Sequence, residues 1–377
     1  MDVIAATRQH VEKERIVSKL ISLCGAAILL VFAARVATVQ AEHRRLTLAV
    51  IMTNDPVANQ IKVYDARTKA LLQTLSTHGK GGVGGNARGV KQYDGELFAA
   101  VNNGSNTVSL FRRDGDSLTF DKLVTTTSAP VSIDFGNDHM YVAGATTVDS
   151  FMLDRRHMEW MDGTTGLALA GGGLPPAGST AQVGVIDERR LLVTLKADPD
   201  PGTVDIVVLH DGAVTGAAPT TVSAPVGTLT PFGFSVYPDG TAVITLAHSS
   251  QDGLFRNGAF TSVIGAGQVA PCWTTRAGKY VFTANTGSRT ISRLIGTGNN
   301  IFVDGPVAAS ITTGGPTDID ADEGVMGVID HGAGQSHLSV LTYNRFGELT
   351  ASGSPINLGA ANANGVAIMA PSDVDRH

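Results

Sequence analysis

The sequence contains little cysteine, few aromatic residues and few charged residues. Of its 377 residues, 2 are cysteines, 6% are aromatic and 16% are charged. Cys24 lies in an apolar N-terminal stretch, so the rest of the chain has only Cys272 and cannot form an intramolecular disulfide. The same count excludes cysteine-rich zinc sites and any Cys-x-x-Cys redox motif.

Basic residues are also scarce. The chain has 28 Lys and Arg against 34 Asp and Glu, a net charge of −6, and a pI near 5.9. Nucleic-acid binding needs clustered cations, so nucleic acid is not an expected partner. The low charge and the 43% hydrophobic content argue against disorder. Abundant Thr, Val, Ser and Gly instead favour many short strands joined by tight turns.

Residues 1–41 are predicted to be an export signal. The apolar run Leu20–Ala34 is shorter than the roughly 20 residues that a membrane span requires. Val39 and Ala41 fit the small-residue −3 and −1 positions of a signal-peptidase site. An uncleaved anchor and a buried core helix remain as alternatives. We therefore expect a periplasmic or secreted protein that contacts the membrane only if this segment is retained.

The remaining chain repeats a phrase of strand, tight turn and strand with a period near 45 residues. Turn dipeptides such as Asp94-Gly95 and Asp239-Gly240 recur at matching offsets between the first two strands of each phrase. Four antiparallel strands in about 45 residues form one propeller blade. The phrases begin near Gly89, Pro130, Gln182, Phe232, Pro271, Pro316 and Asn364.

The seventh phrase is incomplete, because Asn364–Met369 supplies only a first strand. The N-terminal part supplies the three that are missing, over Leu46–Thr53, Gln60–Asp65 and Ala70–Ser76. A blade made from both chain ends would close the ring and leave no open sheet edge. The sequence thus predicts an all-β, seven-bladed β-propeller in a single domain over residues 42–370, followed by a polar tail at 371–377.

Two phrases carry a resemblance to a known family. They are Pro271-Cys272-Trp273 with Tyr280–Ser288, and Asn106–Arg112 with Gly115–Thr119. They resemble the lactonase-type seven-bladed propellers, which include 6-phosphogluconolactonases and 3-carboxymuconate lactonizing enzymes. The resemblance implies a propeller fold and a lactone substrate. The family's histidine-bearing motifs have no counterpart here, since Pro130-Val131 and Gln182-Val183 open two blades.

Candidate site residues follow from the predicted blades, because loops before first strands and after second strands share one rim. His248 and His331 are the candidate catalytic bases, since histidine titrates near neutral pH. Arg88 and Lys196 could bind a substrate anion or a developing oxyanion. The other predicted substrate-binding residues are Asn102, Asn285 and Gln182. The alternative for all of these residues is that they are solvated strand ends or turn caps. This alternative is strongest for Asn102 and Asn285, which precede Gly-Ser turns.

Two other patterns partly resemble binding motifs. Gly79–Gly85 lacks the Gly-Lys-Ser/Thr ending and the helix of a phosphate loop, so a flexible inter-blade loop is predicted. Asp318, Asp320 and Asp322 alternate, but the glycine comes one position later than in a calcium loop and the twelfth-position Glu is missing. No metal or cofactor is predicted.

Two functions remain open at this point. The first is an exported lactonase-like hydrolase that acts on a sugar lactone or a carboxylated lactone at the central channel. The alternative is a non-catalytic periplasmic or surface scaffold that binds a small molecule, with a protein partner allowed. A lyase or an isomerase is a more remote option.

Overall fold

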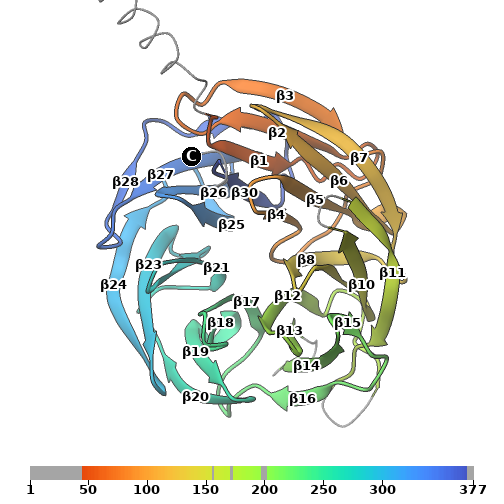
Figure 1. Ribbon diagram of the computed structural model, residues 1–377. Coiled ribbons are helices and arrows are strands. Elements are labelled where there is room, and N and C mark those ends of the chain that lie inside the picture. The colour runs from red at the N-terminus through yellow and green to blue at the C-terminus, as the bar shows by residue number, and fades with distance from the viewer. Residues whose placement is uncertain (1–44, 155–156, 170–172, 197–201, 372–377) are drawn as a thin grey trace, which may run out of the picture. The chain divides into compact units, whose positions relative to one another are not determined.

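The strands form seven antiparallel sheets arranged in a ring, within the residues that the computed structural model describes: 45–154, 157–169, 173–196 and 202–371 (Figure 1). The predicted seven-bladed propeller is confirmed. Each blade is numbered here by its inner strand, in chain order. Residues 1–44 and 372–377, which hold the predicted export signal and almost all of the predicted tail, lie outside the described part. Within that part, no helix is long and apolar enough to cross a membrane.

The first three blades follow one another along the chain. Blade 1 has β4 (Val90–Tyr93), β5 (Leu97–Asn102), β6 (Thr107–Asp114) and β7 (Ser117–Thr125). Blade 2 has β8 (Pro130–Gly136), β9 (His139–Gly144), β10 (Thr147–Asp154) and β11 (His157–Gly166). Blade 3 has β12 (Thr180–Asp187), β13 (Arg190–Leu195), β14 (Thr203–His210), β15 (Ala213–Val214) and β16 (Thr220–Ser223).

Blades 4 to 6 continue the ring. Blade 4 has β17 (Pro231–Val236), β18 (Ala242–Leu246), β19 (Gln251–Arg256) and β20 (Ala259–Ile264). Blade 5 has β21 (Pro271–Ala277), β22 (Tyr280–Asn285), β23 (Thr290–Thr297) and β24 (Asn300–Ser310). Blade 6 has β25 (Gly315–Asp322), β26 (Val325–Gly332), β27 (Gln335–Tyr343), β28 (Leu349–Ala351) and β29 (Ile356–Asn357). Two short 3-10 turns, η1 (Asn103–Ser105) and η2 (Ala247–Ser249), follow second strands.

Blade 7 combines strands from distant parts of the sequence. Its sheet order is β3 (Leu71–Ser76), β2 (Gln60–Asp65), β1 (Leu48–Met52) and β30 (Val366–Met369). β30 is the inner strand and pairs antiparallel with β1, with Val50 opposite Ala367. The last strand of the chain is therefore hydrogen-bonded to the first strand.

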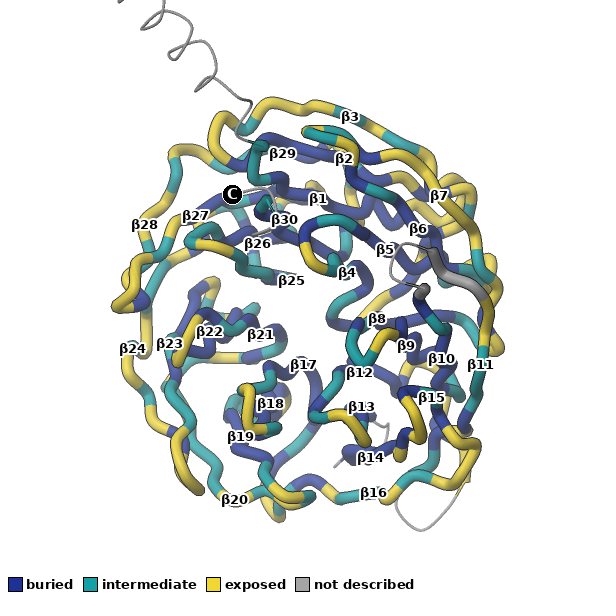
Figure 2. The backbone as a smooth tube through the Cα atoms, in the orientation of Figure 1, coloured by how far each residue is buried: buried dark blue, intermediate teal, exposed yellow. Residues whose placement is uncertain are grey.

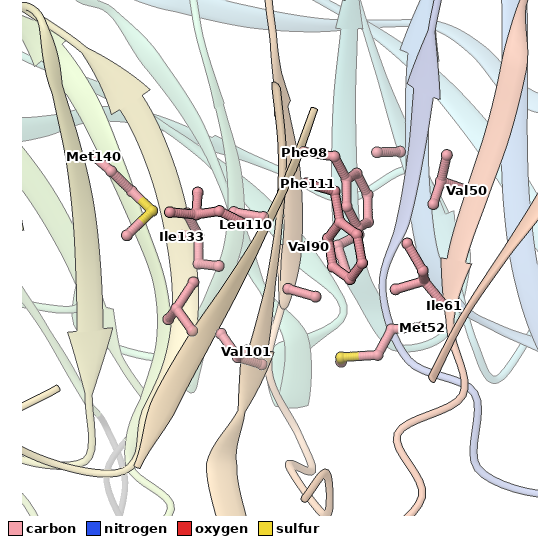
Figure 3. Close-up of a cluster of buried hydrophobic side chains, with 14 of the residues drawn as sticks. Val50, Met52, Ile61, Val90, Phe98, Val101, Leu110, Phe111, Ile133 and Met140 are labelled. Carbon is pink, nitrogen blue, oxygen red and sulfur yellow. The ribbon is translucent and has the colours of Figure 1, made fainter. Parts of the chain in front are cut away.

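The core lies between neighbouring blades, because each sheet is apolar on both faces. Figure 2 shows buried residues concentrated in the inner and middle strands, while outer strands such as β3 and β7 are largely exposed. In blade 1, Phe98 and Phe111 pack toward blade 7, whereas Leu110 on the opposite face packs toward Ile133 of blade 2 (Figure 3). This follows from the alternation of side chains along a strand.

Side chains of one inner strand also bond the free backbone edge of the next. The alternating aspartates of β25 are not a calcium loop, because each accepts a backbone N–H from β30 or the residue after it. The pairs are Asp318 with Val366 (3.2 Å), Asp320 with Ile368 (2.9 Å) and Asp322 with Ala370 (3.1 Å). Gln182 acts similarly between blades 3 and 4, since its amide both accepts from and donates to the Phe234 backbone.

A buried carboxyl makes the stability of this fold depend on pH. Asp252 on β19 is 1% exposed, and its one hydrogen bond among the described residues comes from the Thr283 hydroxyl at 3.2 Å. Burial raises the pKa of Asp252 to about 7 from the ordinary 3.8. Its contribution to stability is therefore complete below pH 3.8 and is lost as the pH rises through about 7.

We expect Asp252→Asn to raise the free energy of unfolding at about pH 7.5 more than at about pH 4.5. The asparagine amide is uncharged at both pH values and keeps an oxygen for Thr283, so it removes only the cost of a buried charge. Denaturant titrations of both proteins at the two pH values measure the effect. The contributions of the other titrating carboxyls to the free energy of unfolding cancel in the difference between variant and wild type. An equal difference at both pH values would contradict the assignment.

Candidate functional site

A β-bulge recurs near the start of the inner strand in blades 2 to 6. The bulged residues are Val131, Ala181, Phe232–Gly233, Cys272 and Thr317. An extra residue in one strand redirects side chains and leaves backbone groups outside the ladder. Three of these side chains, from blades 4, 5 and 6, line a cavity at this end of the ring. Phe232, Cys272 and Thr317 therefore line this cavity at the positions where their strands are bulged.

Asn86 and Ala87 cross the channel just beyond this cavity, and we call them the plug. Both are almost fully buried. They bond the inner strands of blades 2, 3 and 5 and a residue two positions before β30. The bonds are Asn86 Nδ2 to Val131 O (2.7 Å), Ala87 N to Ala181 O (3.0 Å), Trp273 Nε1 to Asn86 O (2.8 Å) and Asn364 Nδ2 to Asn86 Oδ1 (2.9 Å). Two of the acceptors are carbonyls of bulged residues.

The glycine-rich segment before the plug is held in place by Asn54. The Asn54 carboxamide accepts from the N–H groups of Gly82 (2.8 Å) and Val83 (3.0 Å) and donates to the Val83 carbonyl (2.8 Å). A Cβ on Gly81 would lie 2.4 Å from the Asn54 carbonyl carbon, so only glycine fits there. The segment is the inter-blade loop predicted from the sequence. The prediction that it is flexible is not supported, because these hydrogen bonds hold it in place.

The cavity above the plug, which we call the upper chamber, has a volume of about 920 Å³. Lys196 follows β13, His248 lies in η2, and His331 lies on β26, and all three line this chamber. Blades 3, 4 and 6 thus bring together three of the residues singled out from the sequence. Within the described residues, its lining contains no carboxylate.

Lys196 is the Lys or Arg side chain among the described lining residues of the upper chamber. Its Nζ donates to the Gly85 carbonyl and lies 5.6 Å from the centre of the Phe232 ring. Burial lowers the pKa of Lys196 to about 8. At neutral pH the ammonium is still mostly charged. Such an amine can stabilise an anion or exchange a proton near neutral pH.

His331 has a defined tautomer in its neutral form. Its Nε2 lies 2.9 Å from the Ala363 carbonyl, and because a carbonyl only accepts, Nε2 carries the proton. Nδ1 then keeps a lone pair, is not a buried atom, and has no hydrogen-bond partner in the described part of the chain. His248 is an exposed residue on the same chamber. His331 is therefore the better oriented of the two candidate bases.

The wall of the upper chamber is largely aromatic and apolar. Trp273 and Phe232 meet edge to face with ring centres 5.4 Å apart. Cys272 also lines the chamber, and burial raises the pKa of its thiol to about 11. The thiol stays protonated at neutral pH, so it is a poor nucleophile.

Two polar atoms in lining residues lack partners. Thr317 Oγ1 and Asn364 Oδ1 are buried and have no hydrogen bond within the described residues. Buried polar atoms are nearly always paired with protein or water, so these two are candidates for pairing with a bound molecule. Thr317 gave no signal in the sequence, because its exposure to the chamber depends on the bulge.

The other predicted substrate-binding residues do not line the upper chamber. Arg88 and Gln182 face a second cavity beyond the plug. Asn102 is fully buried and donates to Ser109 at 2.7 Å within its own blade. Asn285 is 1% exposed and donates in the same way to Ser292 at 2.9 Å. These equivalent contacts support the turn-stabilising interpretation of both asparagines.

Comparison with known proteins identifies the fold and nothing finer. No family model and no curated protein matches the sequence. A proposed 6-phosphogluconolactonase from Bacteroides fragilis superposes with a TM-score of 0.61 and 13% identity, covering 85% of this chain and 98% of that one. The periplasmic gluconolactonase of Pseudomonas aeruginosa superposes with a TM-score of 0.59 and 15% identity, covering 86% of this chain and 99% of that one.

A protein of different chemistry has a similar fold. Virginiamycin B lyase from Staphylococcus aureus superposes with a TM-score of 0.52 and 15% identity, covering 76% of this chain and 92% of that one. At such identities a likeness establishes architecture alone. The chain therefore has the lactonase-like seven-bladed propeller fold.

Proposed function

We propose that this chain is an exported hydrolase that opens a sugar lactone or a carboxylated lactone in the upper chamber. The observation that carries the proposal is the convergence of Lys196, His248 and His331 from three blades onto one chamber. The likeness to a gluconolactonase supports it at the level of fold. Export rests on the sequence of residues 1–41, and that neighbour is itself described as periplasmic.

In the proposed reaction, His331 Nδ1 removes a proton from a water molecule as the water oxygen attacks the lactone carbonyl. Lys196 stabilises the oxyanion, and the surrounding apolar wall strengthens that interaction. The ring C–O bond then breaks, and the imidazolium returns its proton to the departing hydroxyl oxygen. The unpaired atoms of Thr317 and Asn364 would bond the polar substituents of the ring.

The test is a lactone hydrolysis assay on the purified full chain, with glucono-1,5-lactone and a carboxylated butenolide as substrates. We expect His331→Ala to lower kcat by about 100-fold, as typical for loss of a general base. His248→Ala is measured beside it. His210→Ala is the matched control, because the His210 side chain is 80% exposed on the outer part of blade 3. An inactive wild type, or full activity in both chamber variants, would refute the proposal.

A second candidate function, a non-catalytic binding scaffold, is favoured by a different observation. Lys196 already donates to Gly85 and His331 to Ala363, so the chamber can be stable as a preformed receptor. Its aromatic wall of Trp273 and Phe232 suits the apolar face of a small molecule. Saturable ligand binding without turnover of either lactone would favour this function over hydrolysis.

A further inference from the structure

A second chamber of about 270 Å³ lies along the channel beyond the plug. It is lined by residues of the inner strands of blades 1 to 6 and shares none of them with the upper chamber. Along β21, Trp273 lines the upper chamber and Arg276 lines the second one. We call this second cavity the lower chamber.

Three cationic side chains face the lower chamber: Arg88, Lys91 and Arg276. The Arg88 Nη1 atom lies 3.9 Å from Asp320, and the Lys91 Nζ atom lies 3.5 Å from Asp134. Neither cation makes a side-chain hydrogen bond to the described residues. Arg276 donates one N–H to the Gly278 carbonyl at 2.8 Å. Most of the N–H donors of these three groups are therefore unused.

The carboxylates of the same chamber are already engaged. Asp134 accepts the Val185 N–H at 2.8 Å, and Asp320 accepts the Ile368 N–H at 2.9 Å. Asp318, on the same strand as Asp320, is only 3% exposed, and burial raises its pKa to about 7, so it carries only part of its charge at neutral pH. Within the described residues, no group of three His, Cys, Asp or Glu could hold a metal ion. The unused N–H donors of the three cations therefore suit an anion.

Arg88 is held in a strained backbone conformation. Its φ is +57°, a region that non-glycine residues seldom adopt. It directly follows the plug, and its carbonyl accepts the Ile133 N–H at 2.9 Å. Strain of this kind persists where the surrounding structure fixes it, and it concentrates at ligand sites. The backbone of Arg88 is thus fixed beside the lower chamber.

We propose that the lower chamber binds a small doubly charged oxyanion, with inorganic phosphate as its probe. The Arg88 guanidinium provides two parallel donors for such an anion, and Lys91 and Arg276 provide further charge-assisted hydrogen bonds. The anion would pair with the N–H donors that these three cations leave unused among the described residues. This site is separate from the proposed lactone site, and its test does not measure hydrolysis.

Phosphate binding is measured by calorimetry and thermal unfolding on the purified full chain, at constant ionic strength set with sodium chloride. We expect saturable binding in the wild type and a Tm that rises with phosphate concentration. Arg88→Gln and Lys91→Met should each weaken binding at least 10-fold. Lys122→Met, on the exposed outer strand β7, should leave the dissociation constant unchanged.

The lysine variant keeps the proposal testable if Arg88→Gln disturbs the plug. Lys91 lies on β4, and among the described residues its ammonium makes only the 3.5 Å contact with Asp134, so its loss should leave the fold intact. The absence of saturable phosphate binding to the wild type would overturn the proposal. An unchanged dissociation constant in Lys91→Met would overturn it equally. Lactone hydrolysis can succeed or fail independently of either result.

Discussion

Trp273→Ala is expected to lower the free energy of unfolding by about 4 kcal/mol, in the range typical for truncating a buried tryptophan. Trp273 is 8% exposed and packs in one cluster with Phe232 and Ala87. Its indole N–H also donates to the Asn86 carbonyl of the plug at 2.8 Å. The truncation therefore leaves a cavity beside the upper chamber and removes a bond that holds the plug. Guanidinium titration followed by circular dichroism measures the loss.

A second variant of Trp273 separates the effect of packing from that of the hydrogen bond, and a variant of Trp160 serves as the control. Trp273→Phe keeps an aromatic ring and removes the N–H donor, so it should cost about 1 kcal/mol for the lost bond together with a smaller packing loss. Trp160→Ala is the matched control, because Trp160 is the other tryptophan of the chain and is 53% exposed on β11. Equal losses from Trp273→Ala and Trp160→Ala would show that Trp273 has no special role at the plug.

The blade pattern could be predicted from the sequence because its signals are local. Each first strand and its hairpin turn lie within about a dozen residues, and the turn residues carry the required backbone conformation. Asp94 and Gly95 have positive φ, as do Asn137 and Asp138 in the next blade. Such signals depend on nearest neighbours alone. The inner strands accordingly begin within two residues of the predicted phrase starts.

The plug could not be predicted, because its contacts join residues that are far apart in the sequence. Asn86 bonds Trp273, 187 positions away, and Asn364, 278 positions away. Nothing in the residues around Asn86 marks these partners. The plug nevertheless decides which candidates share a chamber: Lys196 and His331 lie on one side of it, and Arg88 lies on the other. The single rim expected from the sequence is thus two chambers.

The bulges explain a second gap between sequence and site. A period-two pattern predicts which face of a strand is buried, but one extra residue reverses the assignment beyond it. Thr317 and Cys272 are such extra residues, and both line the upper chamber. Cys272 is partly exposed, and its thiol has a raised pKa.

Arg113 connects the two ends of the propeller to blade 1. It is 6% exposed on β6, and its guanidinium donates to carbonyls on both sides of the β1–β30 junction. The acceptors are Met369 O (3.1 Å), Ala370 O (3.3 Å), Leu46 O and, next to the arginine, Gly115 O (2.8 Å). A single side chain thus satisfies carbonyls just before the first strand and at the end of the last one.

Arg113→Met is expected to lower the free energy of unfolding by about 4.5 kcal/mol, because three carbonyls from the chain ends lose a charged donor worth about 1.5 kcal/mol each. Arg190→Met is the control: its side chain is 40% exposed, and its ion pair with Asp187 is worth at most about 1 kcal/mol. Hydrogen exchange adds spatial information, since amides of β30 and β1 should lose protection before those of β22. Uniform loss of protection around the ring would mean that Arg113 stabilises the core generally and does not specifically hold the closing blade.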